Sequence, residues 1–176
     1  EVNKVMNGLI KKTPFETNFR INNLAIVNGV PKTLGLLNLI KIYVEHQREI
    51  ISRRTQFELT AALKRAHILE AYVIVGNNVD KVVKLIRTSS NPEEARTALM
   101  SKFKLTEVQA RAILDLRLQR ITNIEVKNTE EELARCKEEI IRLEGILGDT
   151  NVLDNVIISE LKDIKKKYND TRKTKI

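Results

Sequence analysis

One stretch of the chain limits the possible folds more than any other. From Leu36 to Val75 there is no proline or glycine, and Gly35 and Gly76 flank the stretch. Roughly 40 uninterrupted residues predict one helix about 60 Å long at about 1.5 Å per residue, well beyond the usual length of about 11–12 residues. A helix this long needs a partner along its length. Its apolar residues follow a seven-residue repeat that Gln47, Arg54 and Lys64 interrupt, and the predicted buried positions are Leu36, Ile40, Tyr43, Ile50, Phe57, Ala61, Ile68, Ala71 and Val75.

The partner is expected further along the chain. Thr129–Glu132 has the spacing of a capping box, which predicts that a helix begins there. Its predicted buried positions are Leu133, Cys136, Ile140, Leu143 and Leu147. A second helix is predicted over about 152–168, with Leu153, Ile157, Leu161 and Ile164 on one side. Placed in series, the two helices nearly match the first in length, so we expect an antiparallel arm.

Residues 77–127 lie between the two limbs and are expected to form a small helical knob at the tip. Asn91–Glu94 and the capping box Thr106–Gln109 predict two helix starts, and the second helix is expected to reach Ile121. That helix carries apolar residues on two opposite sides. Since a small knob covers only one side, the other is a candidate dimer interface. The candidate residues are Val108, Ala110, Ile113, Leu114, Leu116, Leu118 and Ile121.

The N-terminal part contains the only convincing β structure. A short helix is predicted to end at Thr13-Pro14, short strands are predicted over 17–21 and 24–27, and Asn28-Gly29 predicts a hairpin turn. The chain as a whole is therefore expected to be mainly α. Its expected parts are a helix and hairpin over 1–32, the outgoing helix over 33–76, the knob over 77–127 and the returning helices over 128–176.

Composition and charge narrow the possible functions. The single cysteine excludes an internal disulfide, and no apolar run approaches the roughly 20 residues that span a bilayer. The net charge is +8, and residues 160–176 carry seven basic against three acidic residues. This concentration suggests a surface that faces nucleic acid, although a solvated lysine face is the alternative. The candidate DNA-facing residues are Arg48, Arg53, Arg54, Lys162, Lys165, Lys166 and Lys167.

Motifs for catalysis are missing from the sequence. There is no glycine-rich phosphate loop, and His46 and His67 lie too far apart along one helix to form a metal pair. We interpret both histidines as structural. No tyrosine has an obvious catalytic setting, so neither a catalytic nor a metal-binding residue is predicted.

Four segments nevertheless resemble one family: 46–59, 65–70, 109–122 and 168–176 are similar to the A subunits of the type IIA DNA topoisomerases, DNA gyrase and topoisomerase IV. The Leu-Arg-Leu-Gln-Arg stretch at 116–120 favours gyrase. The resemblance implies the end of the tower domain over 1–32, the coiled-coil arm and the exit gate. This gate holds the dimer together and releases the transported duplex.

The resemblance also implies an isomerase that supercoils DNA in the bacterial cytoplasm, associated with the nucleoid, or in a plastid. Its partners would be a second copy at the tip knob, duplex DNA bound without sequence preference, and the B subunit of gyrase. The catalytic tyrosine and the sites for Mg²⁺ and ATP would lie outside this chain, so this segment alone is expected to be inactive. The alternative is a stand-alone coiled-coil adaptor. Its basic root, the end of the arm opposite the knob, would dock on nucleic acid or on another protein.

Overall fold

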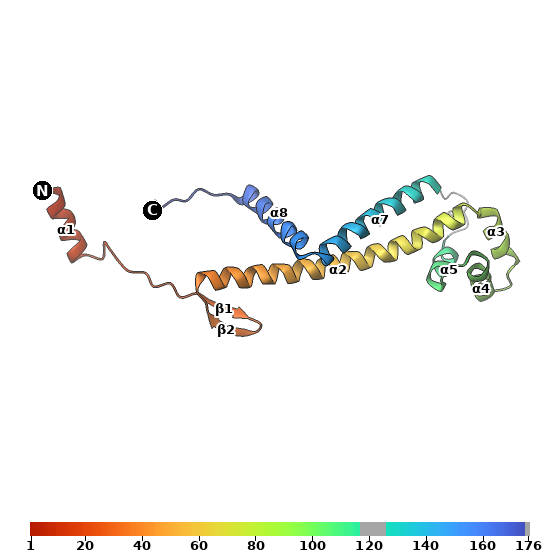
Figure 1. Cartoon of the computed structure of the whole chain (residues 1–176), viewed down its shortest axis with the longest axis horizontal. Coiled ribbons are helices and arrows are strands. Elements are labelled where there is room, and N and C mark those ends of the chain that lie inside the picture. Colours follow the sequence, from red (N-terminus) through yellow and green to blue (C-terminus); the bar gives the residue numbers. More distant parts are fainter. Residues whose placement is uncertain (117–125, 175–176) are drawn as a thin grey trace. The chain divides into compact units, whose positions relative to one another are not determined.

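The computed structural model describes residues 1–116 and 126–174, and it confirms a mainly α fold with one small hairpin (Figure 1). The chain divides into two units, Glu1–His46 and Gln47–Ile176. The boundary falls inside the long helix α2 (Leu36–Gly76), which confirms the predicted uninterrupted helix. Within the described ranges, no helix combines the length and the apolar character needed to cross a bilayer.

The first unit holds helix α1 (Val2–Lys12) and strands β1 (Leu24–Val27) and β2 (Val30–Thr33). The two strands pair antiparallel, and the turn residues Asn28 and Gly29 both have positive φ, 53° and 80°. This is the geometry that an Asn-Gly hairpin favours. The predicted strand over 17–21 was wrong: these residues pair with no strand, since β1 and β2 complete the sheet by themselves.

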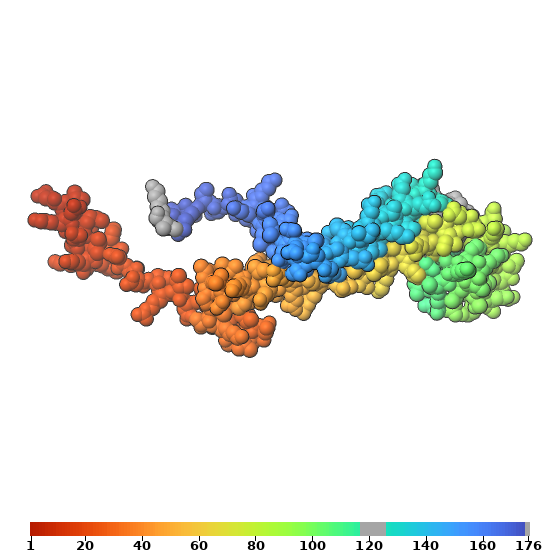
Figure 2. Space-filling view, viewed as in Figure 1, coloured from red at the N-terminus to blue at the C-terminus, as the bar shows by residue number. Residues whose placement is uncertain are grey.

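In the second unit, helix α7 (Val126–Gly148) runs antiparallel to α2. Arg65 pairs with Glu132, the Cys136 thiol donates to the Ala62 carbonyl, and Ile51 packs against Ile146. Residues later in α7 therefore contact residues earlier in α2, as expected for antiparallel helices. Figure 2 shows the side chains of α7 lying against those of α2 along this stretch.

The predicted register of α2 was wrong from its start to its middle, since Leu36, Ile40 and Tyr43 are exposed by 69%, 52% and 47%. Ile50, Phe57 and Ala61 are exposed, Phe57 by 77%, whereas the neighbouring positions Ile51 and Thr55 are buried. The buried side continues through Leu59, Ala66 and Leu69. A search for large apolar residues misses this side because it includes a threonine and an alanine. Arg54 is one of the polar residues that interrupted the predicted register. In the observed register it lies beside the buried side of α2, where it pairs with Glu160.

The returning limb begins further upstream than predicted. Helix α7 begins at Val126 rather than at the Thr129 capping box, since Val126 and Thr129 are half-buried and extend its packed side upstream. Helix α8 (Thr150–Tyr168) buries Leu153 and Ile157 as predicted.

Further along α8, Leu161 and Ile164 were expected on the buried side, and this was wrong. Their exposed fractions are 39% and 54%, because the buried core at this end of the arm consists of Ile51, Ile146, Leu153 and Ile157.

The described part of the knob, residues 77–116, contains α3 (Val79–Thr88), α4 (Pro92–Phe103) and α5 (Glu107–Leu114). Both predicted caps are present: Asn91 accepts from the Glu94 amide, and Thr106 and Gln109 form the capping box. The knob shares one core with the end of α2, formed by Ala71, Val75, Val82, Leu99, Leu105, Ala110 and Ile113.

The predicted helix from Glu107 to Ile121 was too long. Helix α5 ends at Leu114, the Leu116 amide donates to the Ile113 carbonyl in a tight final turn, and residues 117–121 lie outside the described part. Leu114 and Leu116 pack against the knob core, so this turn brings the chain back onto the core.

Neighbouring isoleucines test the corrected register. Ile51 is 1% exposed and Ile50 is 42% exposed, so Ile51→Ala should lower the free energy of unfolding by about 2–5 kcal/mol. Ile50→Ala, the matched control, should cost less than about 1 kcal/mol. Urea denaturation followed by circular dichroism measures both values, and equal costs would contradict the register.

Candidate dimer and nucleic-acid interfaces

The three arginines expected to face DNA are all paired with carboxylates of the same chain. Arg48 donates two hydrogen bonds to Asp154, Nε to Oδ1 and Nη2 to Oδ2, both at 2.7 Å. Arg53 pairs with Glu49 and Arg54 with Glu160, each at 2.5 Å. Arg48 and Arg54 therefore hold α8 on α2, and their charge is largely neutralised by that helix.

The candidate lysines are placed differently. Lys162, Lys165, Lys166 and Lys167 are all exposed on the second half of α8, and the last three occupy its final turn. Cations at a helix C-terminus interact favourably with the helix dipole. The Lys167 ammonium also lies 5.3 Å from the Tyr168 ring centroid. The accessible positive charge of this region is therefore on α8 rather than on the arginines of α2.

Ion pairing shifts the pKa values of four groups on the arm, Asp154, Arg54, Glu139 and Arg142. Hydrogen bonds from Arg48 lower the pKa of the Asp154 carboxyl. The hydrogen bond to Glu160 raises the pKa of Arg54, and the pair formed by Glu139 and Arg142 lowers the pKa of the acid and raises that of the base. The pairs of Arg48 with Asp154 and of Arg54 with Glu160 join α2 to α8, so the arm is held in part by charge pairs at its surface.

Helix α5 presents two different sides. Ala110 and Ile113 are completely buried in the knob core, whereas Val108 is 61% exposed and Ala112 is half-buried. Val108 and Ala112 border a shallow hollow of about 290 Å³, together with Glu107, Arg111 and Asp115. Of the remaining candidates, Leu114 and Leu116 pack against the core, and Leu118 and Ile121 lie outside the described residues. The exposed apolar surface of this helix is thus centred on Val108.

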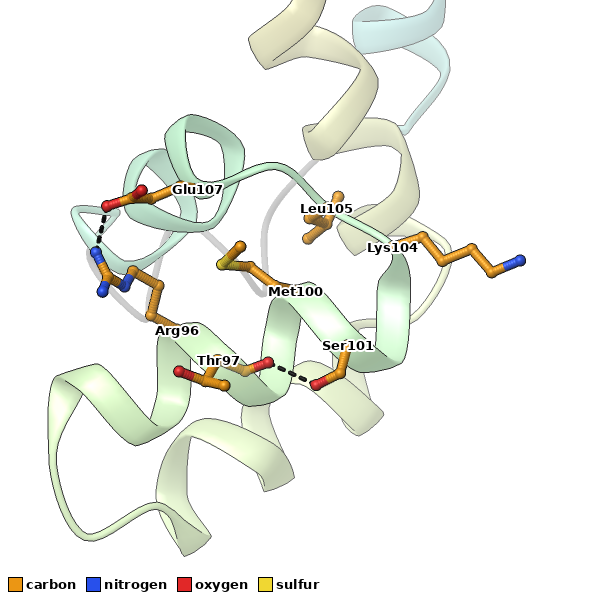
Figure 3. A pocket seen from close by; sticks show the side chains of 7 residues that line it. All are labelled: Arg96, Thr97, Met100, Ser101, Lys104, Leu105 and Glu107. Carbon is orange, nitrogen blue, oxygen red and sulfur yellow. Dashed lines mark hydrogen bonds and ion pairs between the residues drawn. The ribbon is translucent and has the colours of Figure 1, made fainter.

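A second hollow, of about 580 Å³, lies between α4 and α5 (Figure 3). Met100 and Leu105 form its apolar wall, and the ion pair of Arg96 with Glu107 crosses it. Arg96 also pairs with Glu93, so its charge is balanced by two carboxylates. Figure 3 shows the Lys104 side chain extending away from Arg96. The hollow is therefore a surface feature of the knob whose arginine is already engaged.

Two of the sequence motifs meet at the junction of arm and knob. His67 on α2 contacts Thr106 and Gln109, the two residues that cap α5. We predicted a structural role for His67 and a capping role for Thr106 and Gln109, but not their contact. No sequence pattern links residues about 40 positions apart, so only the structure reveals it. Among the described residues, no three His, Cys, Asp or Glu side chains gather where they could hold a metal ion.

The pair between Arg48 and Asp154 can be tested by titration. Because the pKa of Asp154 is lowered in the folded chain, the pair contributes stability above the ordinary aspartate pKa of about 3.9 and loses it as the pH falls through the lowered value. Arg48→Gln should raise the pKa of Asp154 toward its ordinary value, as measured by NMR of the carboxyl carbon. Arg53→Gln is the control, since Arg53 pairs with Glu49 instead. A pKa that Arg48→Gln leaves in place would rule out this ion pair.

The sequence is similar to one family of known proteins. The family model of the A subunit of DNA gyrase/topoisomerase IV matches residues 1–162. The DNA gyrase A subunit of Brachyspira hyodysenteriae is 46% identical over 172 residues, and that of Helicobacter pylori is 45% identical over the same length. The protein of the same name from Halalkalibacterium halodurans is 46% identical over 174 residues. These matches cover 98%, 98% and 99% of the chain but only 21% of each relative, so the chain spans about a fifth of their length. The chain belongs to the family of DNA gyrase and topoisomerase IV A subunits.

Proposed function

We propose that this chain forms the coiled-coil arm and the exit gate of a type IIA topoisomerase, and that two copies meet through the knob. One observation carries the proposal: α5 buries Ala110 and Ile113 in its own knob but leaves Val108 61% exposed. Val108 and the half-buried Ala112 are apolar and border the same hollow, so together they would form the apolar centre of a contact between protomers.

The charges around Val108 suit a two-fold contact. In such a contact both copies use the same patch. If one residue of the first copy contacts another residue of the second copy, the reverse contact is also made. The hollow is bordered by Glu107, Arg111 and Asp115, which means that both signs of charge flank an apolar centre. Arg111 of one copy can then pair with a carboxylate of the other, while Val108 and Ala112 pack at the centre.

The exposed lysines of α8 are proposed to attract duplex DNA. Contacts with phosphates do not depend on base sequence, which fits a surface along which a transported duplex passes. The gyrase B subunit would be the second protein partner. Mg²⁺, ATP and the catalytic tyrosine would belong to parts of the enzyme outside this chain, and the chain alone is proposed to be inactive.

The relatives named above come from bacteria, which supports a bacterial setting for the proposed gate. We place the proposed gate in the bacterial cytoplasm. A stand-alone adaptor is not favoured, because the matching family covers nearly the whole chain.

Charge placed on the two sides of α5 should have different effects. In a symmetric contact Val108→Glu buries two unpaired carboxylates, which costs several kcal/mol, so folded monomers are expected. Ile113→Glu puts the same charge into the knob core and should reduce helicity instead. Ile141→Glu on α7, where Ile141 is 69% exposed, should remain a folded dimer. Analytical ultracentrifugation and circular dichroism distinguish these cases, and a monomeric parent chain would overturn the proposed gate.

Neutralising the α8 lysines should weaken DNA binding and its dependence on salt. The test changes Lys165, Lys166 and Lys167 to Gln in the full chain. The negative slope of log K against log salt should become shallower by about 0.9 for each phosphate that is no longer neutralised. The control changes Lys81, Lys84 and Lys102 of the knob to Gln and should leave the slope in place. Fluorescence anisotropy with a mixed-sequence duplex measures both, and equal slopes for all three proteins would contradict the proposed DNA surface.

A further inference from the structure

One side of α2 faces the knob over three successive turns. Ala71 and Val75 are completely buried in the knob core. His67 lies one turn earlier on the same side, since the three positions are spaced by four. The contact between α2 and the knob therefore continues beyond the apolar core, and at His67 it becomes polar.

The polar contact joins α2 to the N-terminus of α5. The His67 ring Nε2 lies 2.7 Å from the Thr106 hydroxyl oxygen, and the Gln109 side-chain amide donates to the His67 carbonyl at 2.7 Å. The same amide nitrogen lies 3.4 Å from the ring Nδ1. In addition, the Gln109 side-chain oxygen accepts from the Thr106 amide at 3.0 Å. Gln109 is only 6% exposed, and both ends of its side chain are thus engaged.

The hydrogen atoms fix the roles of the two ring nitrogens. An amide nitrogen has two hydrogens and no acceptor capacity, so Nδ1 of His67 must accept from Gln109. A neutral imidazole with its proton on Nε2 then donates to the Thr106 hydroxyl. A helical carbonyl has a second lone pair, so the His67 carbonyl accepts from Gln109 without giving up its own helical bond. Each polar side-chain atom of His67 and Gln109 therefore has a compatible partner.

The returning helix is attached to the same stretch of α2. Arg65 pairs with Glu132 at 2.6 Å, and Lys137 pairs with Glu70 at 3.0 Å. Over residues 65–70, α2 is therefore held to α7 by exposed ion pairs and to α5 by neutral hydrogen bonds around a buried glutamine. Salt screens the ion pairs. Apolar packing has no preferred direction, whereas hydrogen bonds weaken steeply when they are misaligned.

We propose that His67 and Gln109 form the joint that sets the angle of the knob on the arm. The apolar core holds the knob in place, and the directional bonds to Gln109 restrict how it can rotate about α2. If the chain is an exit gate, which is the proposed function above, the same joint transmits movement of the arm to the dimer contact. Gln109 is then a positioning residue.

Gln109→Glu tests the joint most directly. A glutamate keeps the acceptor of the capping box, since this box is commonly closed by Glu, but it loses the amide hydrogens that reach His67. Gln56→Glu, the matched control, makes the same change at an exposed position of α2. Circular dichroism checks that both variants keep the helicity of the parent.

The readout is the distance between spin labels on arm and knob. Thr60 and Ser101 are both exposed, so each can be changed to Cys in a Cys136→Ser background. Labelled chains are diluted with unlabelled ones, which leaves only distances within one chain. At mildly alkaline pH the distribution of Gln109→Glu should be at least twofold wider than that of the parent or of Gln56→Glu. An unchanged width in a folded variant overturns the joint. Should Gln109→Glu fail to fold, His67→Phe takes its place with the same expectation.

The transmission step has its own readout in a complete gyrase, with the variant in its full-length A subunits. Gln109→Glu should lower kcat for supercoiling at least threefold, while the KM for ATP and the amount of DNA cleaved stay constant. A widened distance distribution with unchanged kcat overturns transmission and supports the joint. A parent chain that sediments as a monomer overturns the proposed gate, whereas the spin-label widths decide the joint in either case.

Discussion

The structure of the second unit depends on how the apolar surface of one very long helix is covered. Helix α2 has 41 residues, and an isolated helix exposes every apolar side chain to water. Its side from Ile51 to Leu69 is covered by α7 and α8, and its last turns at Ala71 and Val75 are covered by the knob. The returning helices and the knob can both cover α2 only if the chain reverses direction at the tip. The knob is thus at once the turn of the arm and the cover for the end of α2.

Element types and most helix boundaries could be predicted from the sequence, because local signals determine them. The caps at Asn91 and Thr106 and the turn at Asn28-Gly29 act within a few residues, and all three are present. The buried side of α2 could not be predicted in the same way. It contains Thr55 and Ala66, and which residues are buried depends on the shape of α7 rather than on the apolar character of α2 alone.

At the candidate interfaces too, the sequence could not predict contacts between residues far apart in the chain. The basic residues near the root of the arm were found by counting charges, but counting does not reveal that Arg48 and Arg54 are engaged by α8. Pairing depends on which carboxylates lie opposite, and Asp154 and Glu160 are each 106 positions away. The joint between His67 and Gln109 was missed for the same reason. The lysines of α8 needed no partner to be recognised, since exposure at a helix end follows from local sequence.

The central claim is that two copies meet at the knob while their arms extend from it. The most direct measurement is the distance between identical labels in the dimer, taken in a Cys136→Ser background with one label per chain. A label at Ser101→Cys on the knob should give a short distance between the two copies, and a label at Thr60→Cys on the arm should give a longer one. The reverse order, or no coupling between the copies at either position, would contradict the account.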